Sequence, residues 1–264
     1  MKLINFISKF MYQDNFDKII KPIKHYYDII QIGGSKNIKL LYNNEEFIFT
    51  KVDNLFILQS DTNDDCMTIA IDESLKIANI DNINSDANGL CFKQITAKKG
   101  TLLLLLAIKF AKKLKIDKIT LTDNSHIYCK DIKKHVKFSD LRMIISGDTF
   151  YAKHGFVPVD NNDKQKYNQI KKKFISLKLK NVKFEKYLDK YYKINKKTIT
   201  KESIERIKSF IKSNEDMKMG NFFDILSSKE TFNENCSIVD YLLKKIYNHY
   251  EYDSLYGIKY ELVL

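Results

Sequence analysis

The stretch that most constrains the fold is "KKGTLLLLLAIKFAKKLKIDKITLTD", residues 98–123, in which five consecutive leucines follow a glycine preceded by two lysines. The apolar run ends at Ile108, before Lys109, far short of the ~20 apolar residues that a membrane span needs. It is apolar on all sides up to Ile108 and amphipathic afterwards, which is typical of a helix whose first turns are covered by protein. We therefore expect a helix buried against a sheet.

The segments before this helix predict strands. Short apolar runs separated by polar turns indicate an antiparallel meander, and they lie at residues 38–42, 46–52, 55–60, 67–72 and 76–83. An amphipathic helix is expected earlier, near Asn15 to Ile30, followed by a turn at "GGS". "KITLTD" (Lys118 to Asp123) is again a strand, so strand, loop, helix and strand follow one another as in a parallel crossover unit.

The second half of the chain is expected to be mainly helical. A short helix begins near Ser139, glycines at 147 and 155 interrupt and end it, and a strand runs from Phe156 to Val159. Helical stripes then continue from about 161 to 253, and "YGIKYELVL" ends the chain with the alternation of a strand. We therefore predict a single α/β domain over residues 1–264, with a helical insertion before a last strand at about 256–263 that completes the sheet.

The formal net charge of +12 is unevenly distributed. Residues 164–201 hold 14 lysines against Glu185 and Asp189, whereas residues 61–88 hold seven acidic residues against Lys76. The acidic segment favours a cationic partner, and the lysine segment predicts weak, non-specific nucleic-acid binding at most. Because its aromatic residues recur at helical spacing, a solvated lysine face on a buried helix is the simpler interpretation.

Cysteine and histidine spacing gives no sign of a metal site. Cys66, Cys91, Cys129 and Cys236 are far apart, so we expect reduced, mostly buried thiols, neither a disulfide framework nor a zinc site. The first residues lack the uninterrupted apolar segment of a secretory signal, so we expect an intracellular, cytoplasmic protein that does not contact a membrane.

The order of elements and the heptapeptide "FYAKHGF" (Phe150 to Phe156) resemble the GCN5-related N-acetyltransferases, or GNAT family. The resemblance covers about residues 40–160 and the terminal strand, and the lysine-rich insertion is similar to GNAT-like proteins of large DNA viruses. It implies a GNAT-like, mostly antiparallel mixed sheet flanked by helices, and a transferase that uses acetyl-CoA. The family pattern R/Q-x-x-G-x-G/A is kept only at Gly100, because Ala97 and Leu102 replace its other two positions.

The resemblance also implies site residues. The glycine loop and helix start at Lys98, Lys99, Gly100, Thr101 and Leu102 would bind the pyrophosphate of acetyl-CoA, since a helix N-terminus offers free N–H groups and positive charge.

Tyr151 matches the family tyrosine that protonates the leaving thiolate, and it is equally expected as a packed tyrosine beside Phe150 and Phe156. A backbone N–H of residues 82–84 would polarise the thioester oxygen. Asp81 is the candidate general base; the other candidates are Asp72, Glu73, His126 and His154.

Two interpretations of the function remain open. The chain is either an acyl-CoA-dependent N-acetyltransferase acting on a primary amine of a protein or polyamine, or a catalytically inactive GNAT-like protein with a binding or structural role. In the second case the lysine-rich helices contact nucleic acid or dock a partner. In a purely structural interpretation, the leucine stretch is a crossover helix with a solvated Lys-Lys-Gly turn.

Overall fold

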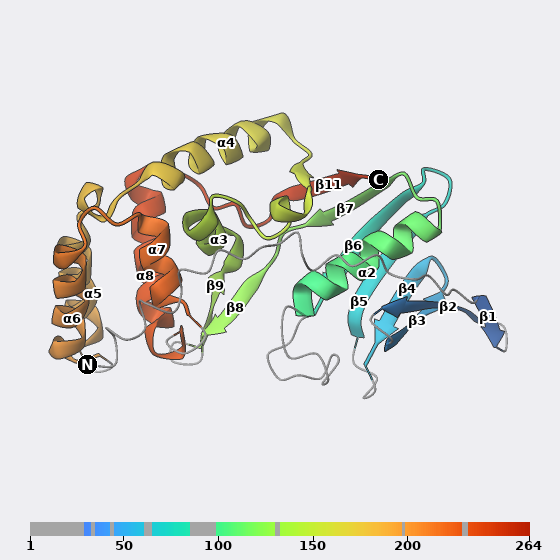
Figure 1. Ribbon diagram of the computed structural model, residues 1–264, viewed down its shortest axis with the longest axis horizontal. Coiled ribbons are helices and arrows are strands. Elements are labelled where there is room, and N and C mark those ends of the chain that lie inside the picture. The colour runs from blue at the N-terminus through green and yellow to red at the C-terminus, as the bar shows by residue number, and fades with distance from the viewer. Residues whose placement is uncertain are drawn as a thin grey trace. The chain divides into compact units, whose positions relative to one another are not determined.

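The computed structural model describes residues 29–32, 35–42, 45–60, 65–84, 99–129, 133–196, 199–228 and 232–264 (Figure 1). These residues form an α/β fold with a mixed, mostly antiparallel sheet and flanking helices. The hydrogen-bonded strand order is β1-β2-β3-β4-β5-β6-β7-β11-β10. The coarse fold class expected from the sequence is confirmed.

The strands of this sheet are short, and most follow the predicted apolar runs. They are β1 (Ile29–Ile32), β2 (Ser35–Tyr42), β3 (Glu45–Val52), β4 (Leu55–Gln59), β5 (Asp65–Asp72), β6 (Ile77–Ile83), β7 (Lys118–Thr122), β10 (Val157–Pro158) and β11 (Lys259–Val263). The helix expected near Asn15 to Ile30 lies outside the described residues, except that Ile29 and Ile30 begin β1. At these two residues the helix prediction is wrong, because they pair antiparallel with β2.

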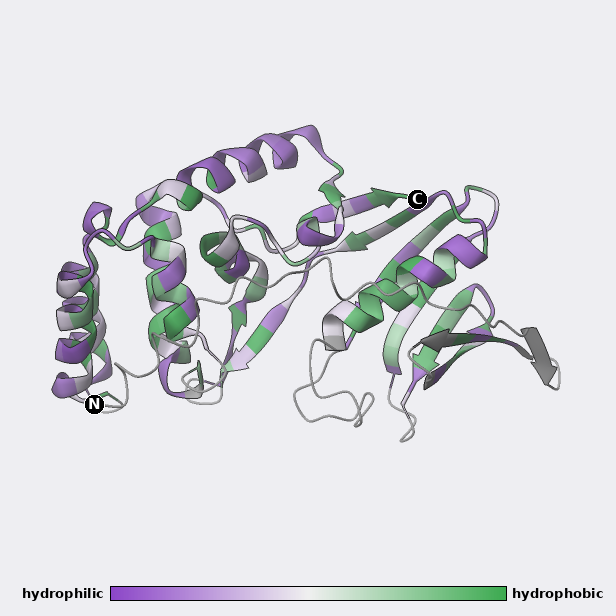
Figure 2. Ribbon diagram, in the orientation of Figure 1, coloured by the Kyte–Doolittle hydropathy of each residue, from purple (hydrophilic) through white to green (hydrophobic). Residues whose placement is uncertain are grey.

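The chain divides into two compact units, described here one by one. The first contains residues 1–69 and 82–110, and the second contains residues 70–81 and 111–264. In the first unit, Phe110 of helix α2 (Lys99–Lys113) stacks on Phe49 with ring centroids 4.3 Å apart and meets the Phe56 ring edge-on at 4.9 Å. The leucine helix is therefore buried against β3 and β4, as expected, and Figure 2 shows hydrophobic green along it after a pale beginning.

The second unit contains the strand that follows the crossover. β7 pairs parallel with β6 through Ile77–Ile80 and Lys118–Leu121. On its other side, β7 pairs antiparallel with β11, and β11 in turn pairs with β10. The expected pairing of the terminal strand with the strand at Lys118 to Asp123 is thus confirmed. That the whole chain is a single domain stays a prediction.

Most helices of the second unit come between β10 and β11 along the chain. The elements are α3 (Phe138–Ser146), η2 (Ala152–His154), α4 (Asn161–Ser176), η3 (Leu179–Asn181), α5 (Phe184–Asn195), α6 (Lys201–Ser213), α7 (Met219–Leu226) and α8 (Phe232–His249). Asp160 caps α4 by accepting from the N–H groups of Asn162 and Asp163, and Thr200 caps α6. The predicted apolar stripe of α4 is buried at Tyr167, Ile170 and Phe174, while Figure 2 shows much of this helix in hydrophilic purple.

Sequence analysis missed a two-stranded sheet, β8 (His126–Cys129) and β9 (Lys134–Lys137). Cys129 of this hairpin forms a disulfide with Cys236 of α8, and Cys66 is also disulfide-bonded. The prediction of reduced thiols is therefore wrong. That prediction rested on the separation of the cysteines along the chain, whereas the fold brings the Cα atoms of Cys129 and Cys236 to 5.7 Å, within disulfide range.

Among the described helices, none is long and apolar enough to cross a membrane.

Candidate functional site

Helix α2 begins at Lys99, where the predicted cofactor loop ends. The first N–H groups of a helix lack backbone partners within it, and here these are the N–H groups of Lys99, Gly100, Thr101 and Leu102. No acidic side chain lies in this first turn, so nothing within it compensates the positive end of the helix dipole. Lys98 lies outside the described residues. The start of α2 therefore offers the donors and the field that an anion requires.

Leu102 occupies the position where the family pattern has a small residue. Its side chain is 8% exposed, and Leu103 and Leu104 are completely buried. Gly100 and Thr101 are half-buried. The Leu102 side chain is therefore part of the packed interior, and Gly100 and Thr101 form the more accessible part of the first turn.

The candidate bases on the strands lie at the surface. Asp81 of β6 is exposed and accepts a hydrogen bond from the side-chain amide of Asn79. Asp72 is exposed too, and it accepts from the Ser74 hydroxyl at 2.6 Å and from the N–H of Leu75 at 2.9 Å. These bonds, led by the Ser74 hydroxyl, lower the pKa of Asp72, so this carboxylate stabilises the turn after β5.

Tyr151 lies at the start of η2 and is 9% exposed. Its ring packs against those of Phe150, Phe156 and Tyr260, with centroids 5.2, 6.1 and 6.3 Å away. Burial, and then the negative charge of Asp123, raise the pKa of the Tyr151 phenol, which therefore keeps its proton at neutral pH. The predicted packing beside Phe150 and Phe156 is confirmed, and the catalytic role stays a prediction.

Asp123 directly follows β7 and is completely buried. Its Oδ1 atom accepts from the backbone N–H of Ser125 at 3.0 Å and from the Ser125 hydroxyl. Its Oδ2 atom is buried with no hydrogen-bond partner among the described residues. Burial is the main cause that raises the pKa of Asp123 to about 6, and the charge of Asp140 adds to it. This carboxyl group can therefore exchange a proton near neutral pH.

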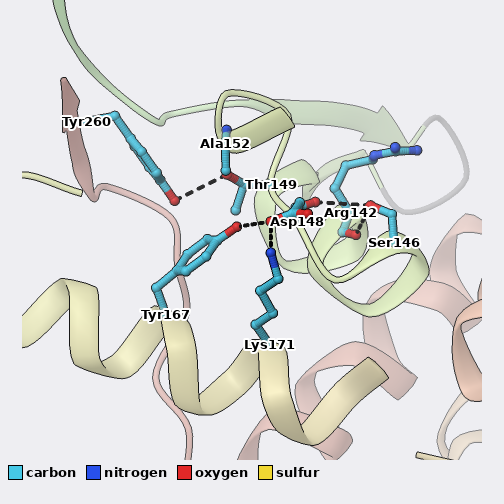
Figure 3. Close-up of polar contacts among 8 residues, drawn as sticks. All are labelled: Arg142, Ser146, Asp148, Thr149, Ala152, Tyr167, Lys171 and Tyr260. Carbon is cyan, nitrogen blue, oxygen red and sulfur yellow. Dashed lines mark hydrogen bonds and ion pairs between the residues drawn. The ribbon is translucent and has the colours of Figure 1, made fainter. Parts of the chain in front are cut away.

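Thr149 and Asp148 link the turn before Tyr151 to later parts of the chain (Figure 3). The buried Thr149 hydroxyl donates to the Tyr260 hydroxyl of β11 at 3.2 Å. The Asp148 carboxylate accepts from the Tyr167 hydroxyl at 2.5 Å and from the Lys171 ammonium at 2.6 Å, both on α4. These bonds hold the segment that carries Tyr151 between the helical insertion and the terminal strand.

The ring centroids of Tyr151 and Tyr260 are 6.3 Å apart, and the backbone of Asp123 hydrogen-bonds to Gly257 and Ile258, just before Tyr260. These three buried residues form one polar cluster in the second unit, where burial, and then the charge of Asp123, raise the pKa values of both phenols. Asp81 belongs to the same unit, and Gly100 belongs to the first. The approach of Gly100 and Tyr151 to one ligand stays a prediction.

Sequence reasoning missed Asp123 and Tyr260. A signal existed for Asp123, because an acidic residue placed directly after a buried strand often lies at a site. Nothing in the sequence marked Tyr260, whose partner Thr149 is distant along the chain.

No group of three or more potential metal ligands occurs among the described residues. Comparison with family models, curated proteins and solved structures finds no match to this chain.

Proposed function

We propose that this protein is an acyl-CoA-dependent N-acetyltransferase of the GNAT type, acting on a primary amine of a cationic acceptor. The observation that carries the proposal is the parallel β6–β7 pair, joined through α2 within a mixed, mostly antiparallel sheet. The pairing ends at Ile80 and Leu121, although β6 continues to Ile83 and β7 to Thr122. The carboxyl ends of parallel strands are a common ligand position in α/β folds.

The residues present fit acetyl-CoA. The N–H groups of Lys99, Gly100, Thr101 and Leu102 would bind its pyrophosphate, and the buried Leu102 side chain leaves that turn accessible. Acetyl-CoA supplies an activated acyl group as a thioester. We expect acetyl-CoA itself to be the acyl donor, with no metal involved in transfer.

The acid–base roles follow from the cluster. Tyr151 holds its proton at neutral pH and can donate it to the departing thiolate. Asp123, whose own pKa is raised to about 6, acts on Tyr151 through its charge, which adds to burial in raising the pKa of that phenol. Asp81, exposed on β6, is the proposed base for the acceptor amine.

A cationic acceptor is proposed because exposed acids surround β5 and β6. Asp65, Asp72, Glu73 and Asp81 are all exposed, and such a surface attracts a lysine, a protein N-terminus or a polyamine. We propose a cytoplasmic location, or the virion if the protein is viral. Burial of Cys129 and Cys236, 1% and 0% exposed, would protect their disulfide from thiols in that compartment.

The alternative is an inactive GNAT-like protein with a binding or structural role. The observation in its favour is the close packing of Tyr151, which is 9% exposed among aromatic rings.

Titration calorimetry of the intact protein with CoA separates the two proposals. The enzyme should bind CoA, and Gly100→Asp should abolish binding, because it adds a side chain and a negative charge to the first turn of α2. Ligand at 100 times its Kd should also stabilise the protein by about 2.7 kcal/mol. If the unsubstituted protein binds no CoA at millimolar concentration, the acetyltransferase proposal is wrong and the inactive alternative stands.

A further inference from the structure

An open groove of about 420 Å³ lies beside the start of α5 and the end of α6. Its apolar lining comes from Leu179, Val182, Phe184 and Ile211, which are all buried. Its charged lining is mainly basic, with four lysines (Lys180, Lys183, Lys186 and Lys212) against Glu185 and Glu215. The groove is therefore a shallow, positively charged depression.

A row of lysines extends this basic surface along α5. Lys183, at the N-cap, and Lys186, Lys190 and Lys193 are all exposed. Spacings of three, four and three residues place them on one face of the helix, over about 15 Å of its axis. None of the four forms an ion pair with a described residue. We call these four residues the α5 lysine row.

Three nearby lysines, unlike the α5 lysine row, pair with acidic side chains. Lys178 and Lys180 both pair with Asp216, at 3.0 and 2.8 Å. Lys208 of α6 pairs with Asp189 at 2.6 Å and with Glu205 at 2.9 Å. The α5 lysine row is therefore a set of four exposed lysines on one helix face with no acidic partner among the described residues.

The opposite side of α5 is fixed in the core. Phe184, Leu188 and Tyr191 are at most 4% exposed, and the Tyr191 hydroxyl hydrogen-bonds to Ser237 of α8 at 2.7 Å. The lysines therefore project from a helix that is held in place. The same burial makes the rings of Phe184 and Tyr191 unavailable for base stacking, on which binding to single strands depends, and the rings of Tyr187 and Tyr192 are half-buried.

From this arrangement we infer that the α5 lysine row binds the phosphate backbone of double-stranded nucleic acid without sequence preference. Lysines act on phosphates as point charges, and a 15 Å row matches about four phosphates of one strand. The whole sequence contains only two arginines, Arg142 and Arg206, so the bidentate base contacts that read sequence have no source in this row. A membrane fits less well, because Ile194 is the single exposed large apolar residue on α5.

The inference does not depend on transferase activity. It is tested by fluorescence anisotropy with two DNA duplexes of unrelated sequence, over a range of salt concentrations. The row variant changes Lys183, Lys186, Lys190 and Lys193 to Gln. The control variant changes four exposed lysines elsewhere to Gln, which are Lys112, Lys134, Lys172 and Lys259. Equal thermal midpoints for the two variants establish that both are folded.

We expect equal affinity for both duplexes and weaker affinity for a single strand. The row variant should lose at least tenfold in affinity, and its log–log salt slope should be less steep by about three to four. The control variant should change far less. An equal loss in both variants, or no duplex binding at low salt, would overturn the inference. Tighter binding to vesicles of anionic phospholipid, or to an acidic polypeptide such as polyglutamate, would also overturn it and assign the row to that partner.

Discussion

The carboxylate of Asp140, in the first turn of α3, accepts a hydrogen bond of 2.8 Å from the backbone N–H of Leu255, although 115 residues separate the two. Its other oxygen accepts from the Ser254 hydroxyl at 2.7 Å. Both Asp140 and Leu255 are buried, so the bond fixes the chain just before β11 against α3. This contact ties the segment that leads into the terminal strand to α3, the helix that precedes Tyr151 in the chain.

Asp140→Ala should therefore destabilise the protein by about 2 kcal/mol, because it leaves the buried N–H of Leu255 without a partner. Denaturant unfolding measures the change. Asp189→Ala is the matched control, since Asp189 is exposed and pairs with Lys208 at the surface. We expect that control to cost less than about 1 kcal/mol. Equal losses in the two variants would contradict a special role for the Asp140–Leu255 bond.

Asp123→Asn should remove the part of the pH dependence of stability that comes from the Asp123 carboxyl group. The pKa of Asp123 is raised in the folded protein from 3.8 to about 6, so between these values the folded state binds more protons than the unfolded state. The free energy of unfolding therefore falls as pH rises from about 4 to 6, by about 3 kcal/mol in total.

Chemical denaturation at several pH values, for both proteins, isolates this contribution. The pKa of Asp140 is raised too and contributes a fall of the same sign, so the informative quantity is the difference between the two curves. A difference that does not change across this pH window would show that Asp123 titrates normally.

Tyr151→Phe tests the proposed proton donor. If the acetyltransferase proposal holds, CoA binding should be nearly unchanged and turnover should fall by about 10²-fold or more, the usual scale of general-acid catalysis. Tyr260→Phe is the matched control, since it removes the other buried phenol near Asp123 and should lower turnover far less. Steady-state kinetics with a polyamine acceptor provide the measurement, and retained turnover in Tyr151→Phe would exclude this role.

Gly220→Ala should destabilise the packing of α7 on α3. A methyl group at Gly220 would lie 2.6 Å from the carbonyl oxygen of Ile145 and 2.7 Å from that of Ile144. Because these neighbours are backbone atoms, the helices must move apart, and we expect a net loss of about 1–3 kcal/mol in thermal or denaturant unfolding. Asn221→Ala, at the adjacent exposed position of α7, should change stability by less than about 0.5 kcal/mol.

The double substitution Cys129→Ser and Cys236→Ser should lower stability by about 4–5 kcal/mol, because the bond closes a loop spanning 107 residues. Denaturant unfolding with and without reductant provides the comparison, and the reductant should affect the double variant less than the unsubstituted protein. Peptide mapping under non-reducing conditions identifies the bond itself. Free thiols at both positions in protein produced under oxidising conditions would contradict the structure.

Elements defined by local pattern were predictable from the sequence, and contacts made by distant residues were not. The leucine helix, the α4 stripe of Tyr167, Ile170 and Phe174, and the terminal strand each follow from hydrophobic periodicity. The β8–β9 hairpin was missed because its strands are only four residues each, and β9 has Val136 as its single apolar residue.

The same distinction applies to the candidate site. The helix start at Lys99 and Gly100 follows from local signals, and so does the position of Tyr151 before Gly155, which ends η2 with a φ of 87°. The buried state of Asp123 depends on the chain before β11: its backbone N–H donates to Ile258, and its carbonyl accepts from Gly257. Only the folded arrangement shows that this carboxyl group is shielded from water.

The position of β11 between β7 and β10 in the sheet also affects how the chain folds while it is being synthesised. Both neighbours leave the ribosome before α4 to α8 are made, which at about 5–20 residues per second takes several seconds. During that time β7 has one side without its eventual neighbour, and an open strand edge is a site of mispairing. The nascent protein is therefore expected to depend on chaperones more than its finished stability suggests.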